Sequence, residues 1–258
     1  MKDTVKQKES EKMSKQDRSK LTLNELILME LMFNSESRSY EETPHIKKYK
    51  EARKLHQQIA DSMSKYLREN GEECFDIVKH NLINKFDTEM DFQEDIDIKV
   101  FMDILVHPYS EDCLCNIFLK KHKVRTEKKI KMIEAMKSST FSIYKIIDTD
   151  MINRSVTLED VFTKKRITII DLRLAMLKPN MKKYYIGMRI ITFDDISFQS
   201  GLILPFNHND QDFRKVIKLN RSRYQPLKIL IDFFNLYHAD VEAGKGCIIN
   251  TQPVYKPR

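Results

Sequence analysis

The sequence has few of the residues on which common nucleotide-binding and hydrolytic sites depend. Its 258 residues include five glycines, four cysteines and no tryptophan. Neither a G-x-x-x-x-G-K-S/T nor a G-x-G-x-x-G run is present, so the sequence lacks the glycine-rich loops whose backbone amides wrap phosphate groups. The G-x-S-x-G and H-E-x-x-H motifs of two large hydrolase classes are missing too. These absences favour a non-enzymatic protein without a bound cofactor.

Long apolar runs are also missing. A helix that crosses a bilayer needs roughly 18 to 20 consecutive apolar residues, and no stretch of the sequence approaches that length. The amino terminus is rich in Lys, Glu and Ser and has no apolar segment of the kind found in signal peptides. The four cysteines follow no disulfide spacing, which favours reduced thiols. We therefore expect a soluble, cytoplasmic protein that makes no contact with membranes.

Helical patterns dominate the first half of the chain. A capping box at Thr22 predicts a first helix. A cap residue followed by proline, Thr43-Pro44, predicts a second helix that ends at Asn70-Gly71. Further segments with helical periodicity cover residues 72–85, 91–106 and 111–137. Together these segments predict a small helical bundle.

After Ser138-Ser139 the hydrophobic period changes to that of strands. Short β-rich runs begin at Phe141, Val156, Arg166, Tyr184, Ile196 and Leu202. Turn residues such as Asp194-Asp195 separate them. The pattern predicts an antiparallel meander of five to six strands that curls into a strongly bent sheet or a barrel. Two helices are expected to follow, over residues 208–220 and 226–240.

The predicted fold class is therefore α+β, with four regions. They are a flexible charged tail over residues 1–20, a helical domain over 21–138, a small antiparallel β module over 139–206, and C-terminal helices with a basic tail over 207–258. The sequence indicates neither the oligomeric state nor whether the helices and the β module pack as one unit.

The β module resembles part of a family of uncharacterised bacterial proteins. The shared pattern is V-x-L-x-D-V/L-F/L-T, then A/M-R-I/L and F-x-S-G, and the matching residues are Val156, Leu158, Asp160, Val161, Phe162, Thr163, Arg189, Phe198, Ser200 and Gly201. With the preceding segment IDIKVFMDILVH, the resemblance covers residues 92–206. Many members of that family carry a cysteine-rich SEC-C zinc tail, which is absent here because Cys247 is the only cysteine in the last 140 residues. The resemblance implies a fold but no known activity.

One cluster of soft ligands suggests a zinc site. It consists of His107, Cys113, Cys115 and His122, and its spacing matches no standard zinc knuckle. Two cysteines in a C-x-C pattern on a helix would also point their thiols in different directions. We expect half-buried cysteines and surface histidines and predict no metal site, although the spacing alone leaves metal binding by these four residues open.

A second segment suggests a metal-dependent nuclease. Its charged residues are Asp91, Glu94, Asp95, Asp97, Lys99 and Asp103, and D-I-D-I-K fits the acid-x-Lys pattern in which carboxylates hold Mg²⁺. That chemistry requires Asp97 and Lys99 side by side on one strand. The apolar stripe from Phe92 to Ile104 has helical spacing instead, so we favour an amphipathic helix with the acids on its outer face.

Two polar residues of the β module, Asp160 and Arg189, also stand out. We expect them to form a buried or rim ion pair that holds two strands together, rather than a catalytic pair. The sequence therefore predicts no catalytic residue.

Positive charge is the remaining functional feature. The net charge is +7 at pH 7, and the basic residues gather in two stretches: Lys120, Lys121, Lys123, Arg125, Lys128, Lys129 and Lys131, then Arg214, Lys215, Lys218, Arg221 and Arg223. If both stretches face one side, they would contact the phosphates of a nucleic acid or nucleoprotein. Nucleic-acid binding is our first hypothesis. The alternatives are a protein-interaction or regulatory module and a metal-dependent nuclease or hydrolase.

Overall fold

The computed structural model describes residues 42–70, 95–107, 113–120, 126–176, 184–207, 209–221 and 224–242. Several predicted features lie outside these ranges. They are the charged tail, the capping box at Thr22, the helix over residues 72–85 and the basic C-terminal tail.

Helix α4 begins and ends where the sequence predicts. It runs over Pro44–Glu69, and its N-cap Thr43 accepts a hydrogen bond at Oγ1 from the backbone amide of Ile46 at 3.3 Å. Proline fits the first helical position, where its missing N–H costs no hydrogen bond. The C-cap Asn70 bonds back to the carbonyl oxygens of the last turn. Both termini are thus fixed by local chemistry.

Three shorter helices follow: α6 over Asp95–Val106, α7 over Leu114–Lys120 and α8 over Glu127–Ser138. The prediction of one helical segment over 111–137 is wrong, because Thr126 has an extended backbone (φ −106°, ψ 128°) and starts a new helix. A β-branched residue disfavours the helix interior, and Glu127 in the first turn stabilises the positive end of the helix dipole.

Five antiparallel strands form one sheet. They are β1 (Thr140–Asp150), β2 (Ser155–Asp160), β3 (Arg166–Ile170), β4 (Tyr184–Phe193) and β5 (Ile196–Asn207), in the order β3-β2-β1-β4-β5. The strand positions agree with the sequence, except that the two runs from Ile196 and Leu202 form one strand. The plain meander is wrong, because β4 pairs with β1 and not with β3. Residues 141–144 of β1 are buried on both faces, as suits a central strand.

The sheet is open but strongly curled. Its edge strands β3 and β5 contact each other without a hydrogen-bonded ladder, so the barrel alternative is wrong and the curled sheet is confirmed. The concave side holds a buried apolar cluster that includes Ile146, Leu158, Ile169 and Met188. A short 3-10 helix over Leu174–Met176 contributes to this cluster.

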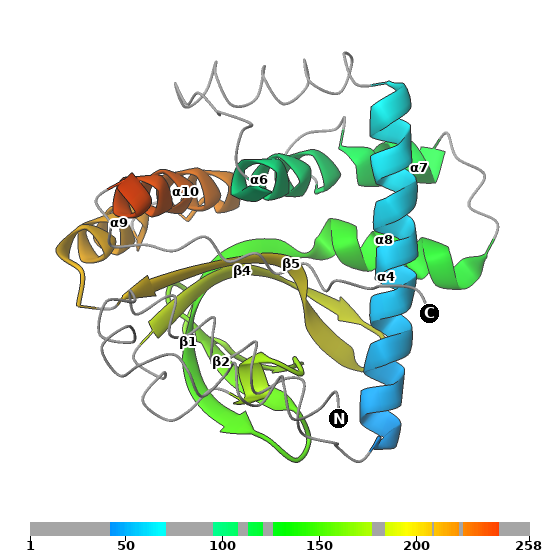
Figure 1. The fold of residues 1–258 in the computed structure, drawn as a ribbon, viewed down its shortest axis with the longest axis horizontal. Helices are drawn as coiled ribbons and strands as arrows, with labels where there is room; N and C mark the ends of the chain where they lie inside the picture. Colours follow the sequence, from blue (N-terminus) through cyan, green and yellow to red (C-terminus); the bar gives the residue numbers. More distant parts are fainter. Residues whose placement is uncertain are drawn as a thin grey trace, which may run out of the picture.

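Helices cover the other face of the sheet (Figure 1). The last two, α9 (Gln211–Arg221) and α10 (Pro226–Glu242), agree with the prediction. One hydrophobic core contains side chains of α4, α6, α7, α8, α9 and α10 together with β1, β4 and β5, so helices and sheet pack as one unit. The α+β fold class is confirmed. Among the described residues, no helix is both long and apolar enough to cross a membrane.

Candidate anion-binding surface and cavity

The structure places eight of the twelve predicted nucleic-acid-binding residues. Lys121, Lys123, Arg125 and Arg223 lie outside the described residues. Lys120 ends α7, Lys128, Lys129 and Lys131 belong to the first half of α8, and Arg214, Lys215, Lys218 and Arg221 belong to α9. All eight are exposed.

The two basic stretches do not meet on one surface. The first turn of α8 lies at one end of the long axis of the structure, and α9 lies at the other end (Figure 1). Both helices cover the same face of the sheet, at opposite ends of the helical layer. The described residues of the two stretches therefore lie far apart, so we judge each stretch alone.

Acidic side chains balance much of the charge at the α8 end. Lys131 bonds to Glu127 at 2.8 Å, and Lys128 lies 3.9 Å from Glu51 of α4. The hydrogen bond to Glu127 raises the pKa of Lys131 and lowers that of Glu127. Nearby, Asp195 of the β4–β5 turn pairs with Lys48 at 2.6 Å. The α8 end is therefore a surface of mixed charge.

Helix α9 presents a more uniform basic face. It contains four basic residues and one acid, Asp212, which pairs with Lys215 at 2.8 Å. Arg214, Lys218 and Arg221 follow each other at helical spacing on the exposed side. Phe213 and Ile217 anchor the opposite side in the core. Within the part of the chain that the structure describes, no ion pair is formed by Lys218 or Arg221.

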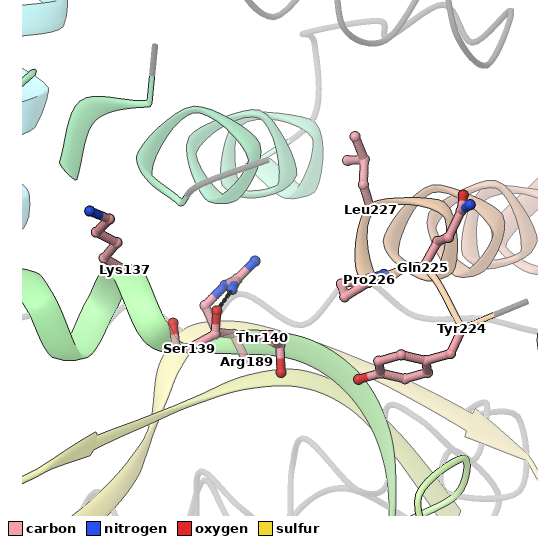
Figure 2. Close-up of a pocket in the computed structure, with 8 residues that line it drawn as sticks. All are labelled: Lys137, Ser139, Thr140, Arg189, Tyr224, Gln225, Pro226 and Leu227. Carbon is pink, nitrogen blue, oxygen red and sulfur yellow. Dashed lines mark hydrogen bonds between the residues drawn. The ribbon is translucent and has the colours of Figure 1, made fainter. Parts of the chain in front are cut away.

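A cavity of about 340 Å³ lies between the end of α8 and the start of α10 (Figure 2). It is lined by Lys137, Ser139, Thr140, Arg189, Tyr224, Gln225, Pro226 and Leu227. These residues come from the end of α8, the start of β1, the middle of β4 and the amino-terminal end of α10. None of these lining residues is acidic. Burial, with a contribution from the nearby Asp160 carboxylate, raises the pKa of Tyr224, so its hydroxyl stays protonated at neutral pH.

Arg189 forms the inner wall of this cavity and is fixed by hydrogen bonds. Its Nε and Nη2 donate to the two carboxylate oxygens of Asp103 at 2.9 and 2.8 Å, and its Nη1 donates to the Ser139 carbonyl at 2.6 Å. Both charged side chains are buried. The pair therefore ties helix α6 to strand β4, beneath the end of α8.

This arrangement corrects two predictions. Arg189 pairs with Asp103 of α6 and not with Asp160, whose Oδ1 accepts hydrogen bonds from the backbone amides of Phe162 and Thr163, both at 2.8 Å. Asp160 thus closes the turn after β2 instead of linking two strands. Asp103 was expected on an outer helix face and is buried.

Ser139, His107 and Asp103 lie in a row that resembles a catalytic triad, yet the hydrogen bonds rule that role out. Nδ1 of His107 lies 2.8 Å from the carbonyl oxygen of Met136, which only accepts, so Nδ1 carries the proton and donates. The Ser139 hydroxyl also donates to Met136, at 2.6 Å, and therefore cannot be activated by His107. Nε2 of His107 lies 3.9 Å from Asp103, too far for a hydrogen bond.

Electrostatics agree with the hydrogen bonds. Burial, together with the Arg189 charge, lowers the pKa of His107 to about 3, so the ring is neutral and a very weak base. Burial also raises the pKa values of the Cys113 and Cys115 thiols, which keeps both protonated. These groups stabilise the interior and do not form a nucleophilic site.

The candidate metal ligands that the structure describes do not form a cluster. Within the described ranges, no group of three or more His, Cys, Asp or Glu side chains is placed to share a metal ion. His122 of the soft-ligand set lies outside those ranges, as do Asp91 and Glu94 of the acidic segment. The D-I-D-I-K segment belongs to α6, in agreement with the helical prediction, whereas the nuclease hypothesis required a strand there.

Sequence reasoning missed the cavity because its residues are up to 90 positions apart. The one available signal was Arg189 within an apolar strand, since a buried charge needs a partner. No such signal is present for Lys137, because its neighbours in the sequence are the charged residues of a helix.

Comparisons with known proteins give one result. A family model described as "Family of unknown function (DUF7986)" matches residues 43–242 of the chain. No curated protein and no solved structure matches this chain.

Proposed function

We propose that this chain, which belongs to the DUF7986 family of unknown function, is a non-enzymatic protein that binds nucleic acid through the basic face of helix α9. The observation that supports the proposal is the charge of this helix. Arg214, Lys215, Lys218 and Arg221 are exposed on 11 residues that contain a single acid, Asp212.

The physical basis is counterion release. Lysine and arginine side chains that neutralise phosphates set free the condensed cations of the nucleic acid, and this makes binding strong at low salt and weak at high salt. Lys218 and Arg221 are the most suitable contacts, because neither is engaged in an ion pair within the described structure. Lys215 contributes less, since it is partly neutralised by Asp212.

The test reverses two charges on α9 and, separately, two at the far end. Lys218→Glu with Arg221→Glu changes the net charge by the same amount as Lys54→Glu with Lys129→Glu, whose side chains are also exposed. Binding to a fluorescent oligonucleotide is measured over a range of salt concentrations. We expect the α9 double variant to lose about tenfold or more in affinity and to show a shallower salt slope, by roughly 1.4 to 1.8.

The control variant should retain most of the affinity, because its substitutions lie on the mixed-charge surface of α4 and α8. Equal losses in the two double variants would show that only net charge matters. Unchanged binding by the α9 variant would refute the proposal outright. All four side chains are exposed, so melting temperatures are expected to stay within a few degrees.

A protein-interaction role is the second candidate. It is supported by Met151 and Ile152 at the turn between β1 and β2, because Ile152 is 81% exposed. Exposed apolar side chains that lie together contribute to contacts with a partner when they form part of a larger patch. Replacing both with serine should weaken partner binding, if this role is correct, without changing oligonucleotide affinity.

A further inference from the structure

We propose that the cavity between α8, β4 and the start of α10 binds the phosphorylated terminal nucleotide of the nucleic acid that α9 contacts, a ligand assignment that rests on the proposed function. The position of the cavity is the first argument. Tyr224 follows Arg221, the last residue of α9, by three positions. Since consecutive Cα atoms are about 3.8 Å apart, their Cα atoms lie within about 11 Å of each other. A strand held along α9 can therefore end in the cavity.

Charge is the second argument. The lining includes two basic side chains, Lys137 and Arg189, and no acidic one. Asp103 largely neutralises Arg189 from behind, so Lys137 supplies the net positive charge. Within the described residues, no ion pair is formed by Lys137. A phosphate monoester carries more negative charge than a backbone phosphodiester and gains more from this environment.

Further polar groups add to the positive potential. The hydroxyls of Thr140 and Tyr224 line the cavity, and Tyr224 is a proton donor at neutral pH. The amino-terminal end of α10, which starts at Pro226, carries the positive end of the helix dipole. Figure 2 shows Thr140, Tyr224 and the start of α10 around the same space, with Lys137 at the opposite rim and its amino group pointing away from Arg189.

Size and apolar lining are the third argument. About 340 Å³ exceeds the needs of a phosphate ion and falls in the range of small ligand sites, which are roughly 300 to 1,000 Å³. Tyr224 is 42% exposed, and Pro226 and Leu227 also line the cavity. An exposed aromatic ring next to basic side chains is a platform on which a nucleobase stacks. A nucleotide with a terminal phosphate satisfies both parts of the cavity.

The test compares three single-stranded oligonucleotides of one sequence: with hydroxyl groups at both ends, with a 5′-phosphate, and with a 3′-phosphate. Affinities are measured for the wild-type chain, for Lys137→Gln and for Lys129→Gln, a matched change on the same helix outside the cavity. We expect wild type and Lys129→Gln to bind one phosphorylated form about tenfold more tightly than the unphosphorylated one. Lys137→Gln should bind all three alike.

The outcomes separate the two proposals. Equal wild-type affinity for all three oligonucleotides overturns the cavity assignment and leaves the role of α9 intact. A phosphate preference that persists in Lys137→Gln also overturns it. If the chain binds no oligonucleotide, the α9 proposal fails, and the ligand of the cavity is tested by titration with adenosine monophosphate and with adenosine. Preferential binding of the monophosphate that is lost in Lys137→Gln supports a free nucleotide as the ligand. Equal binding of the two compounds, or no binding, overturns the assignment.

Discussion

Removal of Arg189 should destabilise the protein far more than removal of any surface cation. This guanidinium donates two hydrogen bonds to the carboxylate of Asp103 and one to the Ser139 carbonyl. Arg189→Met keeps the apolar stem but leaves the Asp103 side chain, 3% exposed, as a buried charge that has lost its guanidinium partner. Breaking a buried pair from one side costs about 3 to 5 kcal/mol, against a total stability of roughly 5 to 15 kcal/mol for a domain.

The exposed pair of Lys48 and Asp195 is the matched control. Its N–O distance, 2.6 Å, is shorter than either contact between Arg189 and Asp103, but both side chains are more than half exposed. Lys48→Met should therefore change the free energy of unfolding far less than Arg189→Met does, because water replaces the lost partner. The burial of an ion pair, and not its N–O distance, determines how much stability is lost when one partner is removed.

Urea unfolding followed by far-ultraviolet circular dichroism measures both effects. A double variant, Asp103→Leu with Arg189→Met, removes both charges and should regain a large part of the loss caused by Arg189→Met alone. The reasoning is refuted if Arg189→Met and Lys48→Met have equal effects, or if the effects of the two core substitutions simply add.

Three further predictions concern stability. Gly187→Ala should cost about 1 to 3 kcal/mol in urea unfolding, because its Cβ would lie 2.9 Å from Cζ of Phe141; an unchanged unfolding midpoint would contradict the tight packing. Burial lowers the pKa values of His56 and His107 from 6.5 to about 3, so the unfolded chain binds protons more strongly than the folded chain. The free energy of unfolding should therefore fall by roughly 1.4 kcal/mol per histidine for each pH unit from 6.5 toward 3. Replacement of His56 with leucine should make this pH dependence shallower when unfolding is measured at several pH values. Thr43→Ala should lower the free energy of unfolding by about 1 kcal/mol, whereas Thr43→Ser should restore it, as measured by thermal melting.

Local features were predictable because their causes are local. The termini of α4 follow from Thr43-Pro44 and Asn70, and each strand position follows from a short β-rich run between turn residues. The break before α8 was missed because a single threonine in a lysine-rich segment leaves the helical periodicity almost unchanged.

Features that depend on distant segments were not predictable. To predict that β4 pairs with β1, one must know that residues 141–144 of β1 are buried on both faces. The sequence alone does not distinguish such a central strand from an edge strand with apolar residues. The pairing of Asp103 with Arg189 joins positions 86 apart. The separation of the basic stretches depends on the direction in which α8 and α9 leave the sheet, and residue type carries no information about that direction.

The shared interior of helices and sheet has a practical consequence for fragments of this chain. Met132, Ile133 and Met136 of α8 belong to the same core as Phe141 and Ile143 of β1, with only Ser139 between the two elements. A cut at this junction would expose apolar side chains on both pieces. Truncated versions of either half should therefore aggregate when expressed separately, and the two pieces should regain a compact state only when they associate.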